Sequence, residues 1–247
     1  MARPYLSIII PAWNEAKRLP ITLIDIDKHM AKVDYTYEIL VVNDGSKDNT
    51  AEVAQKMSSH IKNLKVVDNH VNRGKGAVVR DGMLIAQGNY RLFMDADNAT
   101  TVDHFDKMIE HFRTGADVVI GSRAVKGAKL DPPEPFYRQI PGKLGNLFIQ
   151  ALLLPGIWDT QCGFKAFSDR AAEEIFGMMK IVGWGFDVEC LALAKELGYK
   201  IQEIPVHWVN AEGSHIGISD YLKVLIETLK IRLWLWRRKY PFKARTV

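Results

Sequence analysis

The amino-acid sequence predicts an α/β fold with a mostly parallel central sheet and helices on both of its faces. Three observations lead to this prediction. Short apolar runs rich in β-branched residues recur along the chain, segments with helical patterning separate them, and polar residues follow directly where the runs end. With 247 residues and no Pro/Gly/Ser-rich linker or internal repeat, the chain fits one large domain.

The elements can be predicted in chain order. Strands are expected at YLSIII, YEILVV, LKVV, YRLFM and DVVIG. Four prolines between residues 124 and 141 predict an ordered, non-helical loop. After it we expect a helix near 142–154, a strand around CGFKAF, a helix across GFDVECLALAKELG, a strand at YKIQEIPVHWV and a last helix over about 218–238. The sequence thus predicts a domain over 1–217 and a basic amphipathic helix and tail over 218–247.

Composition and charge narrow the class of protein. The net charge of +4 comes from the end of the chain, because eight Lys and Arg residues from position 221 onward face one Glu. This tail charge does not indicate a nucleic-acid partner. Two cysteines, Cys162 and Cys190, give no disulfide framework or metal-ligand spacing and suit a reducing, cytoplasmic compartment. The N-terminal apolar run is expected to be a strand rather than a signal peptide, and no window is apolar enough to span a membrane.

Asp95 and Asp97 follow the YRLFM run, one residue apart. Paired carboxylates at a strand end suit Mg²⁺ or Mn²⁺, which take oxygen ligands and complete their shell with water and substrate phosphates. Taken alone, such a pair more often caps the next helix. The polar groups at the other strand ends favour the metal site.

Two further strand ends carry groups suited to a nucleotide. Asp44 could accept from N3–H of uracil or from the donors of guanine, and an ordinary Asp-Gly turn is the alternative. Glu15 at the neighbouring strand end makes these two interpretations about equal. The segment NRGKG at 72–76 predicts an anion site of backbone N–H groups and Lys75, with a solvated basic helix start as an equal alternative.

The remaining polar candidates lie further along the chain. Arg123 follows the fifth run, where a guanidinium can bind phosphate oxygens in a planar fork, and Arg138 and Lys165 could extend this positive surface. Each of these cations alone is more typical of surface charge. Asp187 and Glu189 begin a predicted helix, where a favourable interaction with the helix dipole explains them slightly better than catalysis does.

The last predicted helix has two apolar stripes. The first consists of Leu222, Leu225, Ile226, Leu229, Leu233 and Trp236, and the second of Val224, Ile231 and Leu235. One stripe can pack on the domain. The other, beside Trp234, Arg237, Arg238 and Lys239, is left for lipid or a partner protein. A buried helix with a solvated basic end is the alternative.

Taken together, PAWNE at 11–15, NDGS at 43–46, NRGKG at 72–76, DAD at 95–97 and GSR at 121–123 resemble the family 2 glycosyltransferases with the GT-A fold. The later segments DTQCGFKAF at 159–167, WGFDVE at 184–189 and EGSH at 212–215 resemble the polyprenyl-phosphate glycosyltransferases. Within that group, these segments resemble the dolichyl-phosphate β-glucosyltransferase branch more than the dolichyl-phosphate mannosyltransferases. The resemblance extends to about residue 217 and does not include the tail.

The resemblance implies a role for each matched position. The residues implied to bind the nucleotide are Pro11, Trp13, Glu15, Asp44 and Asp95, next to the anion site at Lys75. Asp95 and Asp97 are implied to hold the metal and the diphosphate. Candidates for catalysis are Asp97, Arg123 and Asp187, and candidates for binding the acceptor or its phosphate are Arg138, Lys165 and His215.

Three positions depart from the family pattern. Trp13 stands where the family has Tyr, so a contact through the hydroxyl is lost. Ala99 stands where the mannosyltransferases have a Gln metal ligand, which favours the glucosyltransferase branch or a water in its place. His215 replaces a Lys, so a permanent charge becomes one that titrates near neutrality.

The function expected from this resemblance is inverting transfer of a hexose from a nucleotide diphosphate sugar to a polyprenyl phosphate. Glucose and UDP are favoured, Mg²⁺ or Mn²⁺ is the expected cofactor, and a peripheral position on the cytoplasmic face of a membrane is expected, with a possible membrane-protein partner. A GDP-mannose donor, a soluble sugar or polysaccharide acceptor, and a non-enzymatic nucleotide-sugar-binding subunit are the alternatives.

Overall fold

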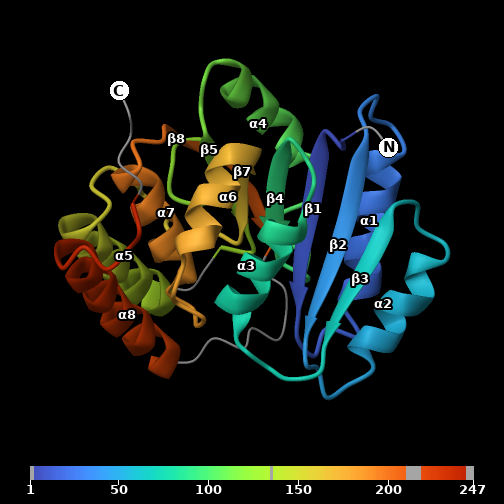
Figure 1. Ribbon diagram of the computed structural model, residues 1–247, viewed down its shortest axis with the longest axis horizontal. Coiled ribbons are helices and arrows are strands. Elements are labelled where there is room, and N and C mark those ends of the chain that lie inside the picture. Colours follow the sequence, from blue (N-terminus) through green and yellow to red (C-terminus); the bar gives the residue numbers. More distant parts are fainter. Residues whose placement is uncertain (1–2, 134–135, 210–217, 243–247) are drawn as a thin grey trace.

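A seven-stranded sheet forms the centre of the molecule, in the order β3-β2-β1-β4-β7-β5-β8 (Figure 1). The structure is a computed structural model that describes residues 3–133, 136–209 and 218–242, without the side chains of 136–139, 218 and 219. The strands of this sheet are β1 (Leu6–Ala12), β2 (Tyr37–Asp44), β3 (Leu64–Asn69), β4 (Tyr90–Met94), β5 (Val118–Ser122), β7 (Phe164–Ser168) and β8 (Ile201–Pro205).

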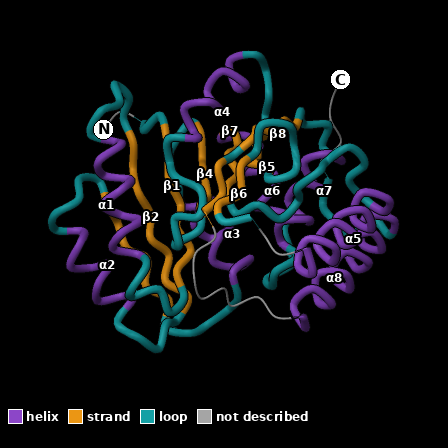
Figure 2. The backbone as a smooth tube through the Cα atoms, turned by 180° about the vertical axis from the view of Figure 1, so that it is seen from behind, coloured by secondary structure: helices purple, strands orange, loops and turns teal. Residues whose placement is uncertain are grey.

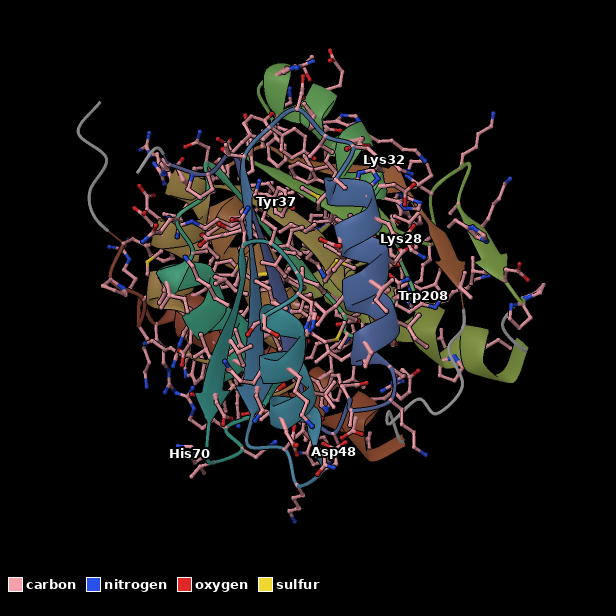
Figure 3. The ribbon with its side chains drawn as sticks, turned by 90° about the vertical axis from the view of Figure 1, so that its right-hand side faces the viewer. Lys28, Lys32, Tyr37, Asp48, His70 and Trp208 are labelled. Atoms are coloured by element: carbon pink, nitrogen blue, oxygen red, sulfur yellow. The ribbon has the colours of Figure 1, made fainter. Side chains whose placement is uncertain are left out.

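The sheet is mostly parallel, as predicted. The exception is β7, which pairs antiparallel with both β4 and β5. β1, β2, β3 and β4 run in the same direction, so their polar ends meet at one edge. Figure 3 marks both edges: Tyr37 begins β2 at one end of the molecule, whereas Asp48 and His70 lie just beyond β2 and β3 at the other.

Helices cover both faces of the sheet (Figures 1 and 2). Alternate strand residues bury their side chains on the two faces. The first half of the chain supplies α1 (Leu19–Met30), α2 (Thr50–Ser58), α3 (Lys75–Ile85) and α4 (His104–Arg113), and the second half α6 (Asp169–Met178) and α7 (Phe186–Glu196). Ile9 and Phe93 pack in one core with α3, α6 and α7. Ile8 and Leu92 pack in the other with α1, α2 and α4.

The segment expected to be a non-helical loop to residue 141 differs from that prediction. It contains the short strand β6 (Lys129–Asp131) and the start of α5 (Phe136–Leu152), with Pro141 inside the helix. A proline removes one helical N–H but does not have to end a helix, and the apolar spacing continues on both sides of it. The strand expected over 199–209 is divided into β8 and β9 (His207–Val209), and β9 leaves the main sheet to pair with β6.

The last helix, α8 (Ile218–Trp236), ends two residues before the predicted end and lies beside α5 in both views (Figures 1 and 2). Of the two predicted stripes, the one with Val224 and Ile231 is buried in a core of the domain. The other stripe, which includes Leu229 and Trp236, is exposed. One side of α8 is therefore packed on the domain and the other is exposed, and what the exposed side contacts stays a prediction.

Candidate functional site

The acidic pair lies where three segments of the chain meet. Asp95 follows β4, its N–H donates to the carbonyl oxygen of Gly163 at 3.1 Å, and its Oδ1 accepts from Lys75 Nζ at 2.6 Å. A Cβ on Gly163 would stand 2.0 Å from Asp95 Oδ2, so only glycine fits there. The end of β4, the start of α3 and the 159–163 segment are thus fixed against one another.

Asp97 lies two residues further, in a turn where Asn98 has a φ of 57°. Its Oδ1 accepts from the N–H of Ala99 at 3.1 Å. Burial and the neighbouring Asp95 raise the pKa of Asp97, and the N–H of Ala99 and the charges of Lys75 and Arg18 oppose this shift without cancelling it. Two carboxylates this close to each other would be stabilised in their charged form by a bound cation.

The acidic pair fits Mg²⁺ or Mn²⁺ only together with a substrate. Within the described ranges, no three His, Cys, Asp or Glu side chains converge on one point. Two carboxylates, the oxygens of a diphosphate and water nevertheless make an all-oxygen donor set of the kind these ions take. Asp95 and Asp97 are the residues that would hold the ion.

Lys75 is the first residue of α3, and two aromatic rings surround its ammonium. Nζ lies 5.3 Å from the ring centroid of Trp184 and 5.9 Å from that of Phe186. Burial acts to lower the pKa of Lys75, but the carboxylates of Asp95 and Asp187 outweigh it and raise the pKa. Lys75 therefore stays charged, and its contact with a nucleotide phosphate remains a prediction.

Asp44 ends β2 and is almost fully buried. Its Oδ1 accepts from the N–H of Arg73 at 2.8 Å and its Oδ2 from that of Gly74 at 3.0 Å. The carboxylate thereby fixes Arg73 and Gly74, the residues of the NRGKG segment directly before α3. A carboxylate has further lone pairs, so these two bonds leave Asp44 able to accept from a base, and that contact stays a prediction.

The candidates after β1 lie next to the end of β2. Pro11 is in β1 opposite Val42, and Trp13 is 42% exposed. Both oxygens of Glu15 accept from Arg18, at 2.6 and 2.5 Å, so Glu15 is already paired. Arg18 was not a candidate from the sequence, although its i,i+3 spacing from Glu15 is a visible signal.

Arg123 follows β5 and forms a fork with Asp159 rather than projecting alone. Its Nε and Nη2 donate to the two Asp159 oxygens at 2.8 and 3.0 Å, and its guanidinium carbon lies 4.7 Å from the ring centroid of Trp208. Trp208, labelled in Figure 3, is in β9. Burial acts to raise the pKa of Asp159, but Arg123 outweighs it and lowers the pKa. Arg123 keeps a quarter of its side chain exposed, which leaves its predicted contact with phosphate open.

Lys165 differs from its predicted role. The side chain is fully buried in β7, and its ammonium donates to Asp187 and, at 2.5 Å, to the carbonyl oxygen of Cys162. Burial acts to lower the pKa of Lys165, but Asp187 outweighs it and raises the pKa. A cation enclosed in this way does not bind a substrate phosphate. Its partner Asp187 is also buried, and burial raises the pKa of that carboxyl; the catalytic role predicted for Asp187 stays a prediction.

Two predicted residues cannot be placed. The side chain of Arg138 and all of His215 lie outside the described residues. Besides Arg18, two residues absent from the predictions lie at the site: Asp159, in the DTQCG segment, and Trp184, in the WGFDVE segment. Both segments contributed to the resemblance, but the partners of Asp159 and Trp184 depend on contacts between distant parts of the chain.

Comparison with known proteins agrees with this architecture. A model of the family "Glycosyl transferase family 2" matches residues 7–176. Among solved structures, glucosyl-3-phosphoglycerate synthase from Mycobacterium tuberculosis, in complex with Mn²⁺, UDP and glucosyl-3-phosphoglycerate, superposes with a TM-score of 0.68, covering 93% of this chain and 80% of that one at 18% identity. Mannosyl-3-phosphoglycerate synthase from Rubrobacter xylanophilus gives 0.69, with 99% and 78% covered, also at 18% identity. These likenesses confirm the predicted fold.

Curated relatives match over nearly the whole chain. "Dolichyl-phosphate beta-glucosyltransferase" from Dictyostelium discoideum is 37% identical, with 95% of this chain and 77% of the relative covered. The Trichomonas vaginalis protein "Dolichyl-phosphate beta-glucosyltransferase ALG5A" is 36% identical, with 94% and 74% covered, and the Homo sapiens relative of the same activity is 33% identical, with 92% and 75% covered. The chain therefore belongs to glycosyl transferase family 2 and is a glycosyltransferase of the group that contains the dolichyl-phosphate beta-glucosyltransferases.

Proposed function

We propose that this glycosyltransferase moves glucose from UDP-glucose to dolichyl phosphate or a related polyprenyl phosphate, with inversion at the anomeric carbon. One observation carries the proposal: three relatives named for this activity match 92–95% of the chain at 33–37% identity. The UDP donor is supported by the fold neighbour that holds UDP and Mn²⁺.

Asp95 and Asp97 would hold the metal ion against the donor diphosphate. When bound, Mg²⁺ or Mn²⁺ stabilises the negative charge that develops on the departing diphosphate. The protein's own part is to bring the acidic pair, Lys75 and Arg123 to one edge of the sheet, where they would orient the donor and the acceptor phosphate.

The pairing of the local carboxylates favours a phosphate acceptor over an alcohol. Asp187 is buried against Lys165, and Asp159 is bound to Arg123. A phosphate monoester is already ionised near pH 7, so its oxygen can attack without a general base. The new bond forms at the anomeric carbon while the bond to the diphosphate breaks, and the electron pair leaves with UDP. A single displacement inverts the configuration.

We expect the acceptor preference to reveal this chemistry. Labelled UDP-glucose and Mg²⁺ would be offered with a short-chain polyprenyl phosphate, or with the matching polyprenol that has the same chain but lacks the phosphate. Product should form with the polyprenyl phosphate. The rate with the polyprenol should be at least about a hundredfold lower, because an alcohol needs a base to remove its proton. Comparable rates with both acceptors would contradict the proposed mechanism, and GDP-mannose in place of UDP-glucose tests the donor.

The lipid acceptor requires the enzyme to work at a membrane surface, and α5 and α8 offer a suitable face. The apolar face, as we define it, consists of Ile140, Leu144, Leu147, Leu222, Ile226, Leu229, Leu233 and Trp236, all exposed on these two neighbouring helices. Of these, Leu144 is 62% and Trp236 76% exposed. No helix in the described part of the chain is long and apolar enough to cross a bilayer.

Exposed basic residues lie on the same two helices or directly after α8, at Lys143, Lys223, Lys230, Arg232, Arg237, Arg238 and Lys239. An exposed apolar stripe bordered by cations is typical of helices that lie in the interface of an anionic membrane. We therefore propose that the enzyme is peripheral, with this face on the cytoplasmic leaflet.

Neutralising Arg237, Arg238 and Lys239 to Gln together should weaken binding to vesicles that contain phosphatidylserine by about a hundredfold, since each basic residue contributes about 1 kcal/mol near an anionic surface. Cosedimentation at low and high salt measures this, and the wild-type affinity should fall steeply with salt. A triple neutralisation of Lys28, Lys32 and Lys62 removes the same charge from α1 and from the segments after α1 and α2, on the opposite side of the molecule from α5 and α8 (Figure 1), and should change vesicle affinity much less. Equal losses in the two triple variants would show that net charge alone, and not this face, binds the vesicle.

A further inference from the structure

The start of α3, which carries Lys75, rests on a distant segment at 180–185. The N–H of Gly76 donates to the carbonyl oxygen of Val182 at 2.9 Å. A Cβ on Gly74 would stand 2.4 Å from that same oxygen, and one on Gly76 would stand 2.7 Å from the carbonyl oxygen of Ile181. Glycines at both positions therefore allow a backbone-to-backbone approach. The position of Lys75 depends on where the 180–185 segment lies.

The 180–185 segment also supplies Trp184, whose ring lies under the Lys75 ammonium. Directly after it begins α7, which carries Phe186, the second ring beside that ammonium. An ammonium over aromatic faces is stabilised only while the rings keep their place. The rings of Trp184 and Phe186 thus help to hold Lys75 in contact with Asp95.

Helix α8 holds the 180–185 segment through Glu227. Its Oε2 accepts from the N–H of Gly185 at 2.7 Å. A Cβ on Gly183 would stand 2.7 Å from Oε1, and one on Gly185 would stand 2.6 Å from Oε2. The carboxylate is therefore seated between the two glycines that flank Trp184. Gly185 also precedes the first turn of α7, where a negative charge interacts favourably with the helix dipole.

The residues after α8 hold the other end of the same segment. Lys180 Nζ donates to the carbonyl oxygen of Lys239 at 2.6 Å. Glu189 accepts from the N–H of Ile181 at 2.7 Å and from the Tyr240 hydroxyl at 2.6 Å. The 180–185 segment is thus fixed at both ends by contacts with α8 and the residues that follow it.

From these contacts we infer that Glu227 is a positioning residue for the donor site, acting through Gly185, Trp184 and Lys75 on Asp95. The same helix then has two roles on its two sides. One side carries part of the apolar face, and the other fixes the site that binds the donor diphosphate. This inference rests on the proposed function, because the ligand it concerns is the nucleotide diphosphate sugar.

Replacing Glu227 with Ala should weaken UDP-glucose binding, measured by calorimetry with Mg²⁺ in detergent, by about tenfold or more, as is typical for residues that orient ligand-binding groups. Glu227→Gln retains an acceptor for the Gly185 N–H and should stay within about threefold of the wild type. Glu110→Ala removes an exposed carboxylate from α4 and should leave the affinity unchanged. Thermal unfolding of each variant checks that the protein remains folded at the assay temperature.

A double-mutant cycle tests whether Glu227 acts on the donor site through Trp184. Trp184→Leu alone should also weaken UDP-glucose binding, and combining it with Glu227→Ala should add little further loss, since both changes act on the same contact. Equal UDP-glucose affinity of Glu227→Ala and the wild type, or fully additive losses in the double variant, would overturn the inference. Failure of the wild type to bind UDP-glucose at all would instead overturn the proposed function.

Discussion

Replacing Asp97 with Ala should lower the rate of glucosyl transfer by about a thousandfold, the scale of losing a group that stabilises developing charge. The fold should survive, because burial and Asp95 raise the pKa of Asp97 and its charged form is thus disfavoured in the folded protein. Steady-state rates with UDP-glucose and a short-chain polyprenyl phosphate measure the effect. Denaturant unfolding should show no loss of stability.

Asp106→Ala is the matched control for this variant, since it makes the same substitution at a half-exposed carboxylate in α4, a helix that packs on the same sheet. Its rate should equal that of the wild type. We also expect a chelator to stop the wild-type reaction and added Mg²⁺ or Mn²⁺ to restore it. Turnover by Asp97→Ala, or by the wild type in chelator, would contradict the role of the acidic pair.

Asp187→Asn should destabilise the protein by about 3 kcal/mol, because it leaves the fully buried ammonium of Lys165 without its counter-charge. The midpoint of urea unfolding measures this. Asp169→Asn, which breaks an exposed pair with Arg3 at 2.8 Å, should cost less than about 1 kcal/mol. Replacing both buried partners, as Lys165→Met with Asp187→Leu, should recover much of the lost stability.

The same variant distinguishes the two kinds of acceptor. For the fraction of Asp187→Asn that is folded, kcat should fall by less than about a hundredfold if the nucleophile is an ionised phosphate. A larger fall at unchanged donor affinity, without a loss of stability, would make Asp187 a general base and favour an alcohol acceptor.

The sequence alone predicted which residues gather at the edge of the sheet that forms the site. Parallel strands end on the same side of a sheet, so Glu15, Asp44 and Asp95 had to approach one another once their apolar runs were assigned as strands. The two stripes of α8 also followed from helical periodicity, with Val224 buried and Leu229 exposed.

The charge pairs did not follow from the sequence. From the sequence, Lys165 was interpreted as part of a positive surface. In the structure, β7 lies antiparallel between β4 and β5, and Lys165 is buried there against Asp187 of α7. Arg123 meets Asp159 over 36 residues of chain, and Glu227 meets Gly185 over 42. Local pattern fixes which face of an element is buried, whereas partners so distant along the chain are set by tertiary packing.

The chemical identity of the product tests the central claim most directly. Purified enzyme, UDP-glucose labelled with ¹³C at the anomeric carbon, Mg²⁺ and a short-chain polyprenyl phosphate would be incubated and the lipid product examined by NMR. The proposed reaction predicts a single glucose bonded to the phosphate oxygen in the β configuration, with coupling between the labelled carbon and phosphorus. An α-linked product, glucose on a carbon-bound hydroxyl, or release of free glucose without a lipid product would contradict the proposed function.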